Sequence, residues 1–224
     1  METYTRGQST VDVKDDPKAR ALLQQACENT SRWQADFKGF SADLSVNVNG
    51  KQVHGTAVVK GPREVSVSLP DAELQKWAEG QIGMIAGHRA PRKFDESDGK
   101  YALTFGDDHD HPLGPKLMIH GDDMGSSYRI GGGRITQINR TMKHLAFTIN
   151  VEDSAVTQDG KFLTTRYTVY YFSPQDKKLA NVESFTDAHI RVAQSDLPAS
   201  RRIISYENGD VVVKSLTFTN HKML

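Results

Sequence analysis

The stretch FSADLSVNVNG, residues 40–50, predicts the type of fold that the rest of the chain builds. Its apolar residues alternate with polar ones, which is the period-two pattern of a strand that buries one face. Asn49-Gly50 then supplies a two-residue hairpin turn whose backbone requires positive φ. The chain should therefore return at once as an antiparallel strand over residues 51–60.

The same alternation recurs along most of the chain, with short polar or glycine-bearing turns between the segments. It predicts a consecutive antiparallel series of about ten or more strands. Strands and long helices do not alternate after Pro91, which argues against a parallel α/β sheet. The predicted strands cover residues 40–48, 51–60, 64–69, 101–105, 116–120, 127–130, 134–142, 144–151, 162–172, 180–191, 201–206 and 211–219.

Two helices are predicted, one before the strands and one after the third of them. The first runs from Pro17 to Trp33, because an acid precedes a proline at the first helical position and apolar residues follow at helical spacing. The second begins after Asp71, a helix-capping residue, and ends near Gly87. We therefore expect an α+β fold, mainly antiparallel β. Its strongly curved sheet would be open or partly closed as a barrel, with both helices over the concave face.

Composition places limits on organisation and partners. The 224 residues carry 28 basic and 28 acidic side chains, without blocks of like charge, so nucleic acid is not an expected partner. No apolar run reaches the roughly 20 residues that span a bilayer. We expect a flexible arm over 1–16 and one soluble domain over 17–224. Because the arm lacks the apolar segment of a signal peptide, the protein is either cytoplasmic or exported with that peptide removed. The oligomeric state stays open.

The sharpest local signal is His109-x-His111. In an extended segment residues i and i+2 face the same way, so both imidazoles could bind one divalent ion such as Zn, Fe, Cu or Mn. His120 could add a third nitrogen if the chain turns back. The pattern resembles the His-x-His of cupins, although the glutamate expected a few residues downstream is absent. The alternative is a hydrophilic loop whose histidines and acids are solvated.

A second candidate site would lie between the sheet and the helices. Arginines on strands that face a cavity could clamp a carboxylate or phosphate, and aromatic side chains could line an apolar pocket. The helix dipole alone also explains cations at the end of the second helix. The candidate ligand-binding residues are Trp77, His88, Arg89, Tyr128, Arg129, Arg166 and Tyr170.

Three segments carry a family resemblance: the helix ending at Trp33 with the following FKGFSAD, the helix ending at His88-Arg89, and GSSYRI at residues 125–130. Together they resemble an uncharacterised family, domain of unknown function 3386, known mainly from cyanobacteria and plastids. The resemblance covers the chain from about residue 17 onward. The expected shape is also similar to periplasmic lipoprotein carriers of the LolA and LolB type, which implies an apolar cavity between sheet and helices.

These patterns lead to one preferred function and two alternatives. We expect a soluble protein that binds a hydrophobic or amphipathic small molecule between sheet and helices. The alternatives are a metal-dependent enzyme that uses the histidine loop, and an assembly or scaffold factor. No serine or cysteine nucleophile motif supports covalent catalysis, and Cys27 lies on the apolar face of the first helix as a buried thiol. Whether the protein is an enzyme stays open.

Overall fold

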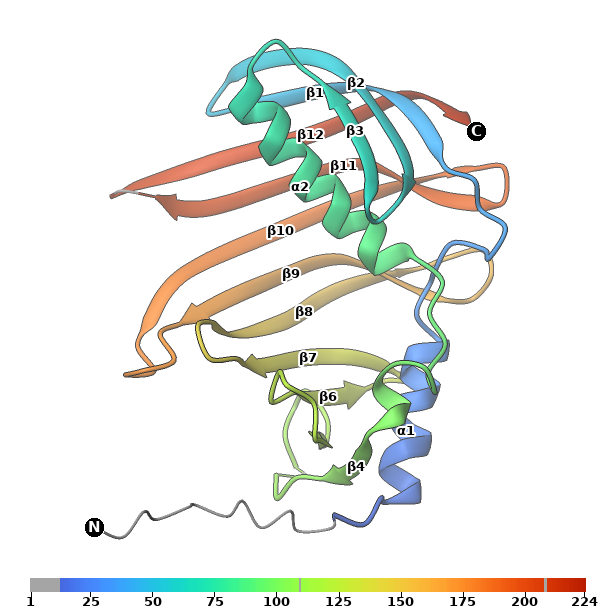
Figure 1. The fold of residues 1–224 in the computed structure, drawn as a ribbon, viewed down its shortest axis with the longest axis vertical. Helices are drawn as coiled ribbons and strands as arrows, with labels where there is room; N and C mark the ends of the chain where they lie inside the picture. Colours follow the sequence, from blue (N-terminus) through green and yellow to red (C-terminus); the bar gives the residue numbers. More distant parts are fainter. Residues whose placement is uncertain (1–12, 109, 208) are drawn as a thin grey trace, which may run out of the picture.

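The computed structural model describes residues 13–108, 110–207 and 209–224, which contain two α-helices, one short 3-10 helix and twelve strands (Figure 1). The elements are, in chain order, α1 (Pro17–Glu28), β1 (Phe40–Val48), β2 (Lys51–Gly61), β3 (Glu64–Ser68), α2 (Ala72–Arg89), η1 (Asp98–Lys100), β4 (Ala102–Phe105), β5 (Lys116–His120), β6 (Ser127–Gly131), β7 (Arg134–Thr141), β8 (Ala146–Val156), β9 (Phe162–Phe172), β10 (Leu179–Val192), β11 (Ser195–Glu207) and β12 (Asp210–Met223).

All twelve strands form one antiparallel sheet in the order β3-β2-β1-β12-β11-β10-β9-β8-β7-β6-β5-β4. The mainly antiparallel curved sheet predicted from the sequence is confirmed. The strands number twelve, where about ten or more were predicted, and the sheet is open rather than partly closed as a barrel. β3 and β4 are its two edges and do not pair with each other in the described chain.

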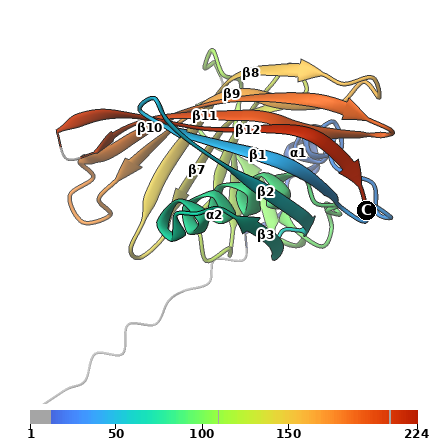
Figure 2. The same cartoon turned by 90° about the horizontal axis from the view of Figure 1, so that it is seen from above.

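This order explains why the helices lie in the hollow of the sheet. β3 and β4 follow one another in sequence but lie at opposite edges, so the chain crosses between them, and α2 makes much of that crossing. α1 starts at the β4 edge, where the Asp16 amide donates to the Leu103 carbonyl over 2.8 Å. Figure 2 shows the sheet as an arch with both helices on its inner side.

The hairpin predicted at Asn49-Gly50 is confirmed. These residues have φ of 47° and 92°, the left-handed values that a tight two-residue turn requires. Val48 and Lys51 are register partners on either side of the turn. The alternate residues Phe40, Leu44 and Val46 of β1 are buried, as the period-two pattern predicts.

The first helix is shorter than predicted. Asp16 caps its first turn as expected, but α1 ends at Glu28 rather than near Trp33. The chain leaves the helix because Asn29 and Ser31 exchange backbone hydrogen bonds with Phe162 at the start of β9, at 2.7 Å each. Trp33 is buried at 4% exposure, but from an extended segment, so its apolar character was wrongly assigned to the helix.

The strand predicted to begin at Arg201 begins at Ser195 instead. The added residues include Pro198, which has no amide hydrogen to donate to a sheet ladder. In the structure the register between β10 and β11 shifts between Ala188 and His189, so that Pro198 lies at a bulge. A central strand can thus include a proline.

The helices fill the hollow at its two ends. α2 packs on β1–β3, β11 and β12, and α1 packs on β4–β7. A smaller apolar cluster lies between them on β9–β11. The buried apolar side chains of the helices are small or aliphatic: Ala19, Leu23 and Ala26 on α1, and Ala78, Ile82, Ile85 and Ala86 on α2.

Two glycines should respond in opposite ways to alanine. Gly39 has φ of +114°, and a methyl group there would collide with the Val59 carbonyl oxygen. Gly80 is helical, with nothing within 4 Å of an added methyl. We expect Gly39→Ala to lower the free energy of unfolding by roughly 2 kcal/mol. Gly80→Ala should raise it by about 0.5–1 kcal/mol. Urea unfolding of both variants measures this, and a destabilising Gly80→Ala would contradict it.

Candidate functional site

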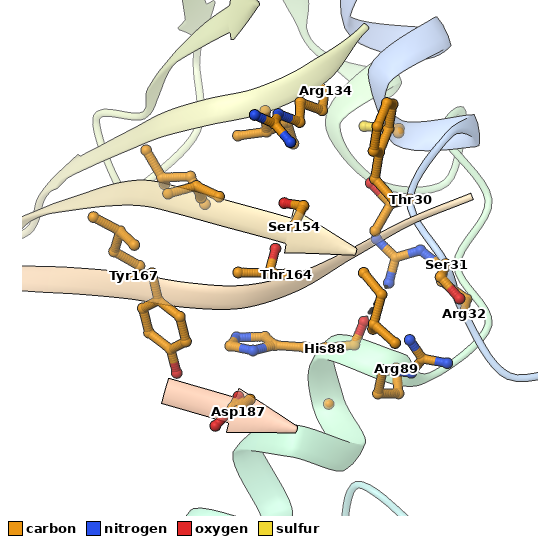
Figure 3. A pocket seen from close by; sticks show the side chains of 18 of the residues that line it. Thr30, Ser31, Arg32, His88, Arg89, Arg134, Ser154, Thr164, Tyr167 and Asp187 are labelled. Atoms are coloured by element: carbon orange, nitrogen blue, oxygen red, sulfur yellow. Dashed lines mark hydrogen bonds between the residues drawn. The ribbon is translucent and has the colours of Figure 1, made fainter. Parts of the chain in front are cut away.

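A cavity of about 330 Å³ lies under the middle of the sheet, between the C-terminal ends of the two helices (Figure 3). Its walls come from the end of α1 and the segment after it, from the end of α2, and from strands β6–β11. The volume lies within the roughly 300–1,000 Å³ of typical small-molecule pockets. The chain thus leaves a hollow between the two regions that its helices fill.

One wall of the cavity is apolar. Ile138 and Ile149 are register partners on β7 and β8, and Val151 and Tyr167 are partners on β8 and β9. Together with Phe147 they line the cavity. Alternate residues of adjacent strands thus form a continuous hydrocarbon surface that can bury a ligand's apolar chain.

The opposite end of the cavity is polar. Ser154 and Thr164, register partners on β8 and β9, lie side by side there, and His88 reaches toward them from α2 (Figure 3). The end is completed by the hydroxyls and guanidinium groups of Thr30, Ser31, Arg32, Arg89 and Arg134. The cavity is therefore amphipathic along its length.

Irregular pairing between β8 and β9 sets which residues face this end. The register shifts on both sides of Asp153, between Val151 and Ser154. In a regular strand Thr164 and Arg166 would share a face. Here Thr164 lines the cavity, while Arg166 is exposed and pairs with Glu152 at 3.2 Å. Because Tyr167 also lines the cavity, a regular strand would turn both Thr164 and Arg166 away from it, so the irregular pairing brings the Thr164 hydroxyl into the cavity wall.

A buried ion pair forms the floor between β10 and β11. Arg201 donates to both carboxylate oxygens of Asp187, over 2.9 and 2.7 Å, and its side chain is 2% exposed. Burial is the largest single effect on Arg201 and disfavours its charge, but the hydrogen bond to Asp187, the charge of Asp187 and the Tyr167 phenol together outweigh it and raise the pKa of the guanidinium. The guanidinium also lies 5.3 Å from the ring centre of Phe185, which stacks on Tyr167.

Two histidines line the cavity, and the pKa of each lies below its ordinary value. Burial and the nearby Arg201 lower the pKa of His88. Burial and the Arg89 cation lower the pKa of His189 to about 4, with Arg201 acting in the same direction and the carboxylates Asp187 and Asp196 opposing. The Nδ1 atom of His189 is buried and has no hydrogen-bond partner among the described residues. Protonating His189 would thus place a further charge among buried cations.

His189 should make stability depend on pH. The unfolded chain binds a proton at this residue below about 6.5, whereas the folded chain binds it only below about 4. The stability that the neutral His189 side chain contributes is therefore complete above about pH 6.5 and is lost as the pH falls from about 6.5 to about 4. At about pH 5 this effect has lowered the free energy of unfolding by about 2 kcal/mol. We expect His189→Gln to reduce the difference in unfolding free energy between about pH 7.5 and about pH 5 by that amount.

Urea unfolding at the two pH values measures this difference. The control is His54→Gln, which changes an exposed histidine on β2 and should leave the pH dependence unchanged. An unchanged pH dependence in His189→Gln would contradict the assignment.

The structure brings together three of the residues predicted to bind ligand. His88, Arg89 and Tyr128 line the cavity. Arg140, on β7, also lines it and donates to the Tyr128 hydroxyl over 2.9 Å. Burial raises the pKa of Tyr128 to about 12, so the phenol stays protonated.

Four predicted residues do not line this cavity. Trp77 packs between apolar clusters on the inner side of the sheet, with Lys214 Nζ 5.8 Å from its ring centre. Arg129 pairs with Asp108 at 2.6 Å, and Arg166 is exposed. Tyr170 alternates with the cavity-side residues of β9 and is half-buried. As ligand-binding residues these four stay predictions.

Several cavity residues come from separate elements and were not predicted from the sequence. No local motif links Arg32, Arg134, Asp187 and Arg201, which meet only because the chain crosses the hollow twice. One signal was available for Arg201, since it shares a strand face with Ile203 and Ser205, both buried. A charge in such a position needs a partner.

The predicted metal site is only partly described. His109 lies outside the described residues. His111 Nδ1 accepts a hydrogen bond from the Leu113 amide over 3.1 Å, and His120 Nε2 is 2.8 Å from Thr104 Oγ1. These two histidines lie toward opposite ends of β5. Within residues 13–108, 110–207 and 209–224, no three His, Cys, Asp or Glu side chains group to hold a metal ion.

The Cys27 thiol also lines the cavity. Burial raises its pKa to about 11, which keeps it protonated and unreactive as a nucleophile. None of the helices in the described part of the chain is both long and apolar enough to cross a membrane.

Similar solved structures share little sequence with this chain. A LolA superfamily protein of Nitrosomonas europaea is 11% identical, with a TM-score of 0.43, over 92% of this chain and 93% of that one. A DUF1329 family protein of Desulfovibrio piger is 8% identical, with a TM-score of 0.27, over 94% of each chain. A chain of the MucA/MucB complex of Pseudomonas aeruginosa is 9% identical, with a TM-score of 0.24, over 92% of this chain and 99% of that one. At these TM-scores the likenesses carry no argument about function.

The comparison with curated proteins finds no match. The family comparison does find one, to DUF3386, a family described as proteins of unknown function. Its match extends over residues 14–224 and confirms the resemblance predicted from the sequence, and the chain therefore belongs to the DUF3386 family.

Proposed function

We propose that this protein binds an amphipathic small molecule in the cavity between its sheet and its helices. The observation that carries the proposal is a cavity of about 330 Å³ with an apolar wall at one end and polar side chains at the other. Such a hollow suits a ligand with a hydrocarbon chain and a polar head.

The apolar wall supplies the expected driving force. Ile138, Phe147, Ile149 and Val151 offer aliphatic and aromatic surface on two adjacent strands. Each methylene group that leaves water for such a surface contributes about 0.8 kcal/mol. A chain of several methylenes therefore offsets the loss of rotational and translational freedom on binding. The polar end then fixes the direction in which the ligand lies.

Titration with dodecanol, followed by calorimetry, tests the proposal without assuming a charge on the ligand. We expect saturable binding of one molecule per chain with a negative heat-capacity change, because apolar surface is buried. Absence of binding by dodecanol and by the other dodecyl compounds named below would overturn the proposal.

The metal-dependent alternative rests on His109, His111 and His120, of which the first lies outside the described residues. It stays a prediction, and elemental analysis of untagged protein, repeated on His111→Ala, tests it. A role as an assembly or scaffold factor likewise stays a prediction, for which pull-down from the native host is the test.

A further inference from the structure

The charges around the cavity do not balance, although those of the whole chain do. The chain has 28 basic and 28 acidic side chains. Among the lining residues that the structure describes, six are arginines and two are aspartates. Both aspartates are already paired, Asp98 with Arg92 at 2.9 Å and Asp187 with Arg201 at 2.7 Å. The lining arginines without an ion pair to a described residue are Arg32, Arg89, Arg134 and Arg140.

Two of these four belong to the polar end and are half-buried, so a ligand in the cavity can reach them. Arg32 uses Nη1 to hold the end of α2, donating to the carbonyls of His88 and Ala90 over 3.0 and 3.2 Å. Arg134 lies 5.6 Å from the ring centre of Phe162, and its side chain forms no hydrogen bond with any described residue. Their remaining N–H groups have the planar arrangement that matches a carboxylate or phosphate.

Arg89 adds a buried positive charge at the same end. It is 4% exposed, and only its Nη2 has a partner, the Asp196 carbonyl at 3.3 Å. Its Nε and Nη1 are buried without a hydrogen-bond partner among the described residues. An unpaired buried cation is costly, and an anion nearby lowers that cost.

Arg140 does not belong to this group. It lies opposite Phe147 in the register, at the apolar wall, and its guanidinium is engaged by Ser126 and by the Tyr128 hydroxyl. The arginines without an ion-pair partner among the described residues thus lie mainly at the polar end of the cavity, with Ser154 and Thr164. The hydroxyl groups of Ser154 and Thr164 are further hydrogen-bond donors there.

We propose that the ligand is an amphipathic anion, whose carboxylate or phosphate group binds between Arg32 and Arg134 while its chain lies along the β7–β8 wall. This inference rests on the proposed function, because it requires that the cavity hold a ligand. It adds the chemical class of the head group and the residues that select it. Neutral and cationic amphiphiles of equal chain length are discriminated against.

Four probes with one common chain test the inference: dodecanoate, dodecyl phosphate, dodecanol and dodecylamine, titrated below their micelle concentrations at about pH 8. We expect both anions to bind at least about tenfold more tightly than dodecanol, and the amine more weakly than dodecanol. The ratio between dodecanoate and dodecyl phosphate decides which head group the site fits. Added salt should lower the affinity for the two anions and leave the affinity for dodecanol unchanged.

Variants locate the head group. Arg134→Gln should lower anion affinity about tenfold and change dodecanol affinity by less than about twofold, and Arg134→Lys should restore part of the loss. Arg32→Gln should act in the same way, with thermal unfolding to check the end of α2. The matched control is Arg202→Gln on β11, an exposed arginine outside the cavity, which should leave all affinities unchanged.

Each outcome has a distinct meaning. Equal affinities for dodecanol and the anions would overturn this inference and leave the proposed function standing. Preference for anions that persists in both Arg32→Gln and Arg134→Gln would overturn the assigned head-group site. No binding by any of the four probes would overturn the proposed function and this inference with it.

Discussion

Replacing Asp187 by alanine should lower the free energy of unfolding by about 3–5 kcal/mol, because it leaves the Arg201 guanidinium buried without its carboxylate. The side chains of Arg201 and Asp187 are 2% and 9% exposed, so the pair is largely removed from bulk solvent. The remaining contacts of Arg201 with Gln81 are long, at 3.4 and 3.5 Å. Urea unfolding measures the loss.

A double variant separates buried charge from lost packing. Replacing Asp187 by leucine and Arg201 by methionine removes both charges while keeping hydrocarbon in place, and should recover most of the stability. The control for a surface ion pair is Glu96→Ala, since Glu96 and Lys93 are 68% and 79% exposed, and its effect should stay within about 0.5 kcal/mol. Equal effects of Asp187→Ala and Glu96→Ala would contradict the buried-pair account.

Replacing Val151 by tryptophan should lower the affinity for dodecanol by about 100-fold. Val151 is the register partner of Tyr167 on the apolar wall, and it lines the cavity. If the indole ring displaces about four methylene groups at about 0.8 kcal/mol each, binding loses about 3 kcal/mol. Calorimetric titration of the variant measures the loss.

The matched control is Val156→Trp. It makes the same substitution on the same strand, at a residue that is 65% exposed and does not line the cavity. Its dodecanol affinity should equal that of the wild-type protein. Circular dichroism of both variants shows whether either has lost the fold. Unchanged dodecanol binding in a folded Val151→Trp would place the ligand elsewhere.

Local patterns in the sequence predicted the regular parts of the fold. Asn49-Gly50 predicted its hairpin because few residues adopt positive φ at two consecutive positions. The bounds predicted for β5 and β9 agree with the structure, since turn residues flank both strands. The errors lie where tertiary contacts override local preference, at the end of α1 and at the bulge that admits Pro198.

A cavity between the sheet and the helices was predicted from the sequence, but only some of the residues that line it were. His88 and Arg89 were identified as cations at the end of the second helix, and Tyr128 as one of the aromatic residues that could line an apolar pocket. Arg32 and Arg134 could not be identified from the sequence, because neither belongs to a motif within its own segment. Their significance arises when the chain crosses the sheet and brings them to the same end of the cavity. Periodicity along one strand does not contain that information, and a bulge can reverse it.

Nuclear magnetic resonance of protein with labelled isoleucine methyl groups tests most directly whether the cavity holds a ligand. Ile85, Ile138 and Ile149 line the cavity, whereas Ile190 and Ile204 are 46% and 37% exposed elsewhere on the sheet and serve as internal controls. On titration with dodecanol, the account predicts saturable shifts of the three cavity methyl groups and none at the two controls. Shifts confined to Ile190 and Ile204, or none at all, would contradict it.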